Sequence, residues 1–313
     1  MRYQNILRIL LLLSAVPCFG QNKLITCRSE KNSDNTISIY ADCEVTGEYT
    51  AKLTFTELEG FNSTVNIISN VALVTVRRGH TEILKLTPMQ SAIRRAIHYK
   101  YAIYPGRVLH RSPDTSFTYL LPASSGVSLR ILKVNTLQEF TGKKPPDDFG
   151  AVDFIYKKGD TICAARAGTI YDFDDEITVG EKKNNLYTKE RNRIFIQHKD
   201  GTLAHYTMLA PIEIFVSAGD EVIPGQPLAV FSKESDKYHL LFSVAYLDER
   251  KAAVNYINDN TPRPTFYHYV PVTFVTNETT TDHLEPGKKY TAEQPKEVIG
   301  AEMSKKDKKK LGP

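Results

Sequence analysis

The chain has 313 residues, of which 41% are apolar and 24% are charged, and this length can supply two domains that each bury a core. The composition excludes intrinsic disorder, because disordered chains carry too little apolar surface to fold. The 40 basic and 36 acidic residues give a formal charge of +4, a balance too even to indicate a nucleic-acid partner. We therefore expect an ordered chain that binds no nucleic acid.

The first part of the chain, residues 1–20, is typical of a signal peptide. Arg2 and Arg8 give it a positive start, and a short apolar stretch follows at residues 9–16. Small residues then stand at the positions of a cleavage site, so the mature chain is expected to begin at Gln21. No later stretch has the roughly 20 apolar residues of a membrane helix. The sequence predicts export to the periplasm, the cell envelope or the medium, without a transmembrane helix in the mature chain.

The cysteines leave two questions open. Cys18 could carry a lipid instead of marking a cleavage site, but Pro17 stands where lipidation sites have a small residue. Cys27 and Cys43 lie in one strand-rich region, and in an exported chain they either form a disulfide or stay as two free thiols. Cys163 lies in an apolar run and is expected to be buried as a small hydrophobic residue.

The rest of the chain is rich in strand patterns, which predicts an all-β fold. Residues 21–117 contain runs that alternate apolar and polar side chains, as in residues 36–41, and these predict an N-terminal β-sandwich-like domain. A second strand-rich region covers residues 118–276, in which the charged stretch from Asp172 to Arg193 is expected to be a surface loop. Residues 277–313 are expected to form an extended C-terminal segment with a Lys-rich tail.

Four motifs follow one another in the second region. They begin with Asp-Phe at Asp153 and an Ala-Ala run before Gly168, and continue with His-x-Asp-Gly at His198, Gly-Asp-x-Val-x-x-Gly-Gln at Gly219, and His-Leu-Leu-Phe at His239. In this order they resemble the lysostaphin/LytM-type zinc metalloendopeptidases, peptidoglycan hydrolases with a duplicated hybrid motif. The resemblance predicts an antiparallel LytM-like sheet from about residue 119 to residue 276, and it does not cover the N-terminal domain.

The resemblance implies a zinc ion held by a His, an Asp and a second His. The fourth position of such a site is left open for a water molecule, which the metal activates to attack a peptide bond of the cell wall. Two further histidines orient the water and stabilise the oxyanion. The resemblance also implies that His198 is a hydrogen-bonded structural residue and not a ligand.

Most of these positions carry other residues in this chain. Asp153 matches the Asp ligand, but Phe149 and Leu241 stand at the positions of the two His ligands. Met208 stands at the position of one catalytic histidine, and only His239 matches the other. One carboxylate without imidazole partners cannot hold zinc usefully, so we expect no metal or other cofactor. Without a metal, the Asp153 carboxylate needs a hydrogen-bond partner, and His239 is the expected one.

Zinc binding would need non-standard ligands. Asp147 or Asp148 could supply a carboxylate, although both are expected to lie in a solvated loop. His205 could supply an imidazole, but it lies on the opposite face of its strand from Tyr206 and Met208. The sequence therefore favours a pseudoenzyme.

Three functions remain open. In the first, the degenerate domain binds peptidoglycan or an envelope protein such as a cell-wall hydrolase, because degenerate relatives are known as regulators of such enzymes. In the second, it is an active zinc metalloendopeptidase that cleaves peptidoglycan with non-standard ligands. In the third, it is a spacer and the sandwich binds the ligand. The missing ligands favour the first function over the second. The groove of the first function is predicted to be lined by Phe149, Tyr206, Met208, His239 and Leu241.

Overall fold

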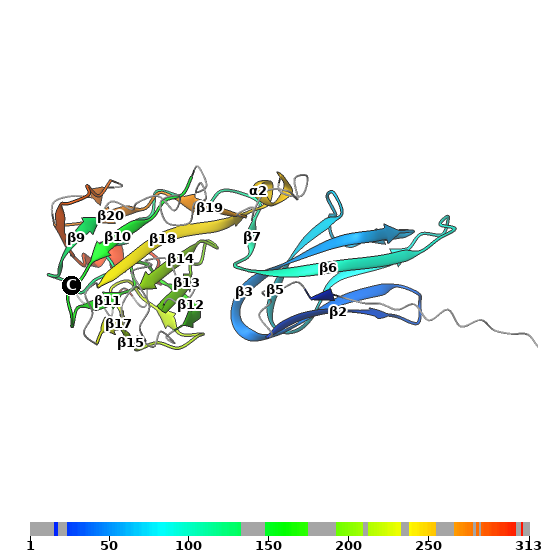
Figure 1. Ribbon diagram of the computed structural model, residues 1–313, viewed down its shortest axis with the longest axis horizontal. Helices are drawn as coiled ribbons and strands as arrows, with labels where there is room; N and C mark the ends of the chain where they lie inside the picture. Colours follow the sequence, from blue (N-terminus) through cyan, green and yellow to red (C-terminus); the bar gives the residue numbers. More distant parts are fainter. Residues whose placement is uncertain are drawn as a thin grey trace, which may run out of the picture. The chain divides into compact units, whose positions relative to one another are not determined.

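The computed structural model describes residues 16–17, 24–132, 148–174, 192–208, 212–232, 238–254, 266–277, 280–281, 283–304 and 308. The chain divides into two compact units (Figure 1). Unit 1 contains the residues up to Glu44 together with Tyr49–Pro105, and unit 2 contains Val45–Glu48 and the residues from Gly106 onward. The described elements are almost all strands, which confirms the predicted all-β fold class.

The second unit begins earlier in the chain than predicted. The sequence placed the boundary at residue 117, but β7 (Val108–Leu109) already pairs with the longest strand of unit 2. This two-residue pairing is too short to leave an apolar periodicity, so the sequence pattern did not show it.

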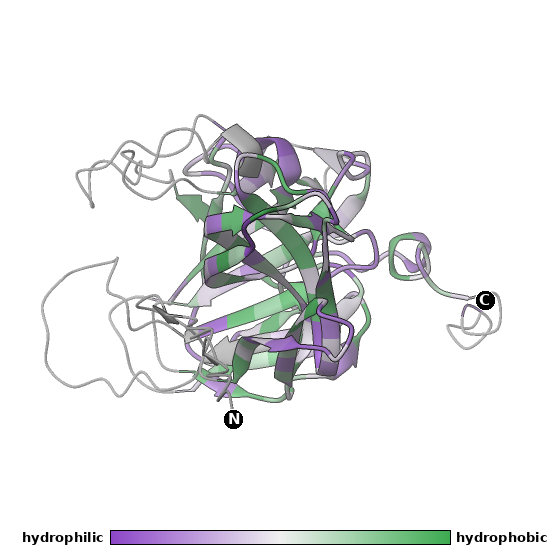
Figure 2. Ribbon diagram, turned by 90° about the vertical axis from the view of Figure 1, so that its right-hand side faces the viewer, coloured by the Kyte–Doolittle hydropathy of each residue, from purple (hydrophilic) through white to green (hydrophobic). Residues whose placement is uncertain are grey.

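Unit 1 is one six-stranded sheet built around two long strands. Along the chain its strands are β1 (Val16–Pro17), β2 (Ile25–Lys31), β3 (Ile37–Glu59), β4 (Phe61–Ser63), β5 (Val71–Pro88) and β6 (Ala96–Pro105). The first half of β3 pairs with β2 and its second half pairs with β6. Apolar side chains of β3 alternate inward from Ile37 to Cys43 and again from Tyr49 to Phe55, so one continuous face supplies the core. Alternating apolar and polar bands are visible along the strands in Figure 2.

Cys27 and Cys43 of unit 1 are both buried, and no disulfide joins them in the described structure. Cys27 lies opposite Ala41, whereas Cys43 lies opposite Ile25, so the two cysteines are diagonal neighbours on β2 and β3. Diagonal neighbours are roughly 7–8 Å apart, which is beyond the usual span of a disulfide. The geometry therefore disfavours a disulfide between them.

Unit 2 contains sixteen strands and two short helices among its described residues. They are β7, β8 (Thr118–Leu120), β9 (Ser128–Leu132), β10 (Val152–Ile155), β11 (Thr161–Cys163), β12 (Gly168–Asp174), β13 (Asn192–Gln197), β14 (Leu203–Met208), β15 (Ile212–Ile214), β16 (Glu221–Val222), β17 (Pro227–Phe231), β18 (His239–Asp248), α2 (Glu249–Val254), β19 (Tyr267–Val270), β20 (Thr273–Val275), β21 (Thr280–Thr281), β22 (Lys289–Thr291) and α3 (Lys296–Ile299).

The main sheet of unit 2 has the strand order β16-β12-β13-β14-β18-β10-β9-β22, with β19 and β7 also paired to β18. Two three-stranded sheets, β11-β17-β15 and β21-β20-β8, complete the unit. One face of the main sheet buries the core, in which Phe154 and Phe242 each pack edge-on against Phe274 of β20. Cys163 is 1% exposed in this unit, so its predicted burial is confirmed.

The motifs of the second region form the turns that connect these sheets. Ala164 donates its backbone N–H to the carbonyl of Gln226 and accepts a hydrogen bond from the N–H of Gly225. Gly225 has a φ of 83°, which favours glycine, and a Cβ there would lie 2.9 Å from the Gln294 side chain. The Ala-Ala and Gly-Gln motifs therefore lie in two segments that are joined by backbone hydrogen bonds.

The segment after residue 276 is part of unit 2, whereas the sequence predicted an extended segment outside the domain. β22 pairs with β9, and Tyr290 and Ala292 are 3% and 1% exposed. Arg166, whose side chain is 4% exposed, binds both carboxylate oxygens of Glu302 at 2.7 and 3.0 Å and also Asp200 at 2.8 Å. A buried guanidinium thus anchors the C-terminal segment to the sheet.

In the parts of the chain that the structure describes, no helix is long and apolar enough to cross a membrane. Within the predicted signal peptide, only Val16 and Pro17 are described, and they pair with Lys100 and Tyr101 of β6. Cys18 and the predicted cleavage site lie outside the described residues. Export therefore stays a prediction.

Candidate functional site

Asp153 and His239 form a hydrogen-bonded pair on the face of the main sheet opposite the core. Asp153 of β10 lies directly opposite Leu241 of β18, and His239 lies two residues before Leu241, on the same face. The His239 Nδ1 atom is 3.1 Å from Oδ1 and 3.2 Å from Oδ2 of Asp153. The Asp153 side chain is 18% exposed and the His239 side chain is 11% exposed. The structure thus joins the two site residues that the chain retains, as expected from the sequence.

Leu241 lies in the centre of this site face. It is half-buried, and its other neighbour in the sheet is Thr207 of β14, which is also half-buried. Asp153, Leu241 and Thr207 therefore form a row across three strands. An aliphatic side chain occupies the middle of the row, where the resemblance implies a zinc ligand.

Tyr206 and Met208 lie on the opposite, core-facing side of β14. They pair with Phe242 and Leu240, and both side chains are 0% exposed. The Tyr206 hydroxyl accepts a hydrogen bond of 2.8 Å from the N–H of Ala165, and burial raises the pKa of Tyr206. A ligand in a groove could not touch either residue. Their predicted role in lining the groove is therefore wrong, because strand alternation places both in the core.

His205 lies on the site face, contrary to the sequence argument. It pairs with Ser243, and its ring packs edge-on against Phe195 at 4.8 Å and Tyr267 at 6.0 Å. Its Nε2 atom is buried without a hydrogen-bond partner. Burial, followed by the nearby Arg193 charge, lowers the pKa of His205 to about 4. The sequence correctly separated His205 from Tyr206 and Met208, but it assigned the wrong one of the two faces to the site.

Phe149 is half-buried and packs its ring edge-on against Tyr269, with 4.9 Å between the centroids. The neighbouring Asp148 is engaged in several contacts through Oδ2, with Lys251 Nζ at 2.6 Å, the Tyr269 N–H at 3.0 Å and His268 Nδ1 at 3.2 Å. Asp148 therefore holds the start of β10 against β19 and is not a spare ligand. Asp147 lies outside the described residues.

His198 is a structural residue, as the resemblance implied. It is 2% exposed, and its Nδ1 atom is 2.8 Å from the carbonyl oxygen of Ala167. Burial, with the charge of Arg166 added, lowers the pKa of His198 to about 4. The neutral ring therefore packs beside the anchor of the C-terminal segment.

The residues that the structure describes do not fit a zinc ion. A zinc site needs three or four N, S or O donors around one point, and the Asp153–His239 pair supplies two. Leu241, which lies opposite Asp153, has no donor atom, and the Phe149 ring is packed against Tyr269. Among the described residues no group of three or more His, Cys, Asp and Glu side chains could hold a metal ion.

One stretch of unit 2 is similar to a known protein family. Residues 149–255 match the model of peptidase family M23, and no curated protein matches the chain. Three solved structures are similar to the chain. A protein from Pseudomonas aeruginosa described as a peptidase of family M23 is 15% identical, with 69% of this chain and 90% of that chain covered and a TM-score of 0.25.

The two others come from Helicobacter pylori and Vibrio cholerae. Csd3 from H. pylori is 13% identical, with 92% of this chain and 77% of that chain covered and a TM-score of 0.28. A zinc-containing peptidase from V. cholerae is 14% identical, with 71% and 75% covered and a TM-score of 0.25. The family match confirms, for residues 149–255, the resemblance to the lysostaphin/LytM-type zinc endopeptidases that the motifs indicated.

Proposed function

We propose that unit 2 is a zinc-free relative of the M23 peptidases and acts in the cell envelope by binding rather than by hydrolysis. Its ligand is peptidoglycan or an envelope protein such as a cell-wall hydrolase, and the chain is exported to reach it. The observation that carries this proposal is the position of Leu241 directly opposite Asp153. An aliphatic side chain there removes a metal donor from the site face.

The Asp153–His239 pair supports the same proposal. In a zinc peptidase the Asp oxygen is given to the metal, and the water-binding histidine is directed at the reacting carbonyl. Here the Nδ1 atom of His239 is directed at both oxygens of Asp153. The two groups satisfy one another, which leaves neither of them arranged for catalysis.

Purified peptidoglycan sacculi test the proposal directly. The mature chain is incubated with sacculi with and without added zinc, and the bound protein and the released soluble fragments are measured. We expect cosedimentation without release, and a zinc content far below one ion per chain by elemental mass spectrometry. Zinc-dependent release that Asp153→Ala abolishes, while the exposed control Asp34→Ala keeps it, would establish the active peptidase instead. Absence of cosedimentation would remove peptidoglycan as the ligand and leave the protein partner.

A further inference from the structure

Unit 2 contains a pocket at the point along one edge of β18 where the pairing with β10 ends and the pairing with β19 begins. β10 pairs with β18 as far as Phe242, and β19 pairs with it from Val244 onward. Between these two pairings, at Ser243, β10 and β19 separate. The segment at His283 and Leu284 borders the opening, which has a volume of about 560 Å³. Ligand pockets commonly have volumes of about 300–1,000 Å³, so a small group of atoms fits.

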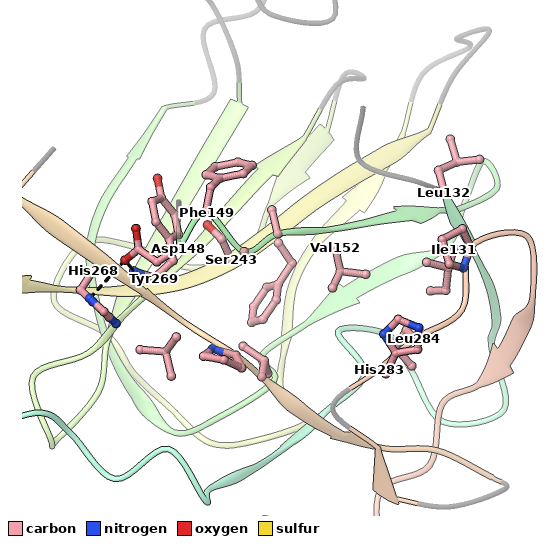
Figure 3. A pocket seen from close by; sticks show the side chains of 17 residues that line it. Ile131, Leu132, Asp148, Phe149, Val152, Ser243, His268, Tyr269, His283 and Leu284 are labelled. Carbon is pink, nitrogen blue, oxygen red and sulfur yellow. Dashed lines mark hydrogen bonds and ion pairs between the residues drawn. The ribbon is translucent and has the colours of Figure 1, made fainter. Parts of the chain in front are cut away.

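The floor of the pocket is apolar. It is formed by residues from five separate strands or segments, namely Ile131, Val152, Phe242, Val270 and Leu284, and all of them except Val152 are 8% exposed or less. Val152 is half-buried, so it presents part of its surface to the opening. Figure 3 shows Val152 in the middle of the pocket, between the Ile131–Leu284 end and the Asp148–His268 end. An occupant would therefore bury an apolar group between two ends of different character.

The Asp148–His268 end is polar and nearly neutral. Lys251, His268 and the N–H of Tyr269 all contact the Oδ2 atom of Asp148. Among the described residues none of these three groups contacts Oδ1, which can accept a further hydrogen bond. Lys251, at 2.6 Å, compensates the charge of the carboxylate. A second ammonium group would be repelled by Lys251, whereas a neutral N–H group would not. The acceptor at this end thus favours an uncharged hydrogen-bond donor over a cation, and a neutral N–H group meets this condition.

An apolar group beside a neutral N–H donor is the chemistry of a polypeptide. The main-chain amide supplies the N–H, and the adjoining aliphatic or aromatic side chain fills the floor. A glycan would present hydroxyl groups to the apolar floor and leave them without partners. We propose that this pocket binds an extended segment of a partner protein, with an apolar side chain on the half-buried Val152 and a main-chain N–H donated to Oδ1 of Asp148. This inference rests on the proposed function, because it assumes that unit 2 acts by binding.

Short synthetic peptides provide the probe. The mature chain is mixed with acetyl-Gly-Leu-Gly-amide or acetyl-Gly-Ser-Gly-amide, and binding is followed by saturation-transfer NMR. We expect transfer to the leucine methyl groups and a weaker signal for the serine peptide. Val152→Phe fills the floor and should weaken leucine-peptide binding at least tenfold. Val65→Phe is the matched control, because Val65 is also half-buried but lies in unit 1. Thermal unfolding of both variants shows whether they fold.

The other outcomes separate this inference from the proposed function. Equal signals from the two peptides, or leucine-peptide binding that survives in a folded Val152→Phe variant, would overturn the pocket assignment. Cosedimentation with sacculi in the same preparation would then leave the proposed function intact. Loss of sacculus binding in Val152→Phe without any peptide binding would overturn the inference in favour of a wall ligand. Zinc-dependent hydrolysis of sacculi would instead contradict the proposed function.

Discussion

Asp153 accepts its hydrogen bond from His239, the residue diagonal to it on the neighbouring strand, at 3.1 Å. The residue directly opposite Asp153 is Leu241, which has no polar atom in its side chain. The residues at positions 239 and 241 of β18 thus determine whether the site face can bind a metal ion. Among the described residues, His239 is the only side chain within hydrogen-bond distance of the Asp153 carboxylate. Leu241 offers no donor atom that could bind a metal ion together with Asp153.

Replacing Asp153 tests whether the pair is structural. Asp153→Ala removes one largely buried charge-assisted hydrogen bond, so the free energy of unfolding of unit 2 should fall by about 1–2 kcal/mol. Asp153→Asn keeps an acceptor and should lose less. Urea denaturation followed by circular dichroism measures both changes. A variant with unchanged stability but altered zinc content would contradict a structural role.

The Arg166 anchor should contribute more to stability. Arg166→Met leaves Glu302 and Asp200 without their buried partner, and removal of one member of a buried ion pair costs about 3–5 kcal/mol. Arg166→Lys should recover only part of this, because an ammonium group cannot bind Glu302 through two nitrogens. Denaturation should show a shift in the transition of unit 2 and none in that of unit 1. A uniform shift of both transitions would argue against a local anchor.

Acidification should destabilise unit 2 between about pH 6.5 and pH 4. His198 and His205 have folded-state pKa values of about 4, below the ordinary value of 6.5. The unfolded chain therefore binds protons in this range that the folded chain excludes, and stability is lost as the pH falls. Each histidine contributes a slope of at most about 1.4 kcal/mol per pH unit.

Variants at these histidines show which of them causes the pH dependence of the stability of unit 2. His198→Gln keeps a donor for the Ala167 carbonyl and should reduce the pH dependence of the melting temperature of unit 2. His80→Gln is the control, because His80 in unit 1 is half exposed at 50%. An unchanged slope in a folded His198→Gln variant would show that other groups take up the protons.

The thiols of Cys27, Cys43 and Cys163 should be unreactive in the folded protein. All three are buried, and burial, with the charge of Asp42 added, raises the pKa of Cys27 to about 12. Iodoacetamide should therefore label them only after unfolding, as peptide mass spectrometry can measure. A linked pair of peptides containing Cys27 and Cys43 in exported protein would instead establish the disulfide that the diagonal geometry disfavours.

The two faces of β14 show what the alternation of side chains along a strand can predict and what it cannot. Alternation correctly placed His205 on the other side of the strand from Tyr206 and Met208. It could not tell which side meets the core, because all three side chains are compatible with burial. The pairing of Tyr206 with Phe242 and of Met208 with Leu240 decides the matter, since these pairs close the core. The site therefore lies on the His205 face.

The amino-acid sequence by itself determined the all-β class, the M23-like motifs, the burial of Cys163 and the choice of His239 as partner of Asp153. These follow from short-range periodicity and from residue types at fixed spacing. Only the tertiary structure decided which face of β14 carries the site, that Arg166 holds Glu302, and that β10 and β19 separate to form a pocket. Arg166 and Glu302 are 136 residues apart in the chain. Such contacts depend on how strands pair across the sheet, and the local alternation of apolar and polar residues does not determine that pairing.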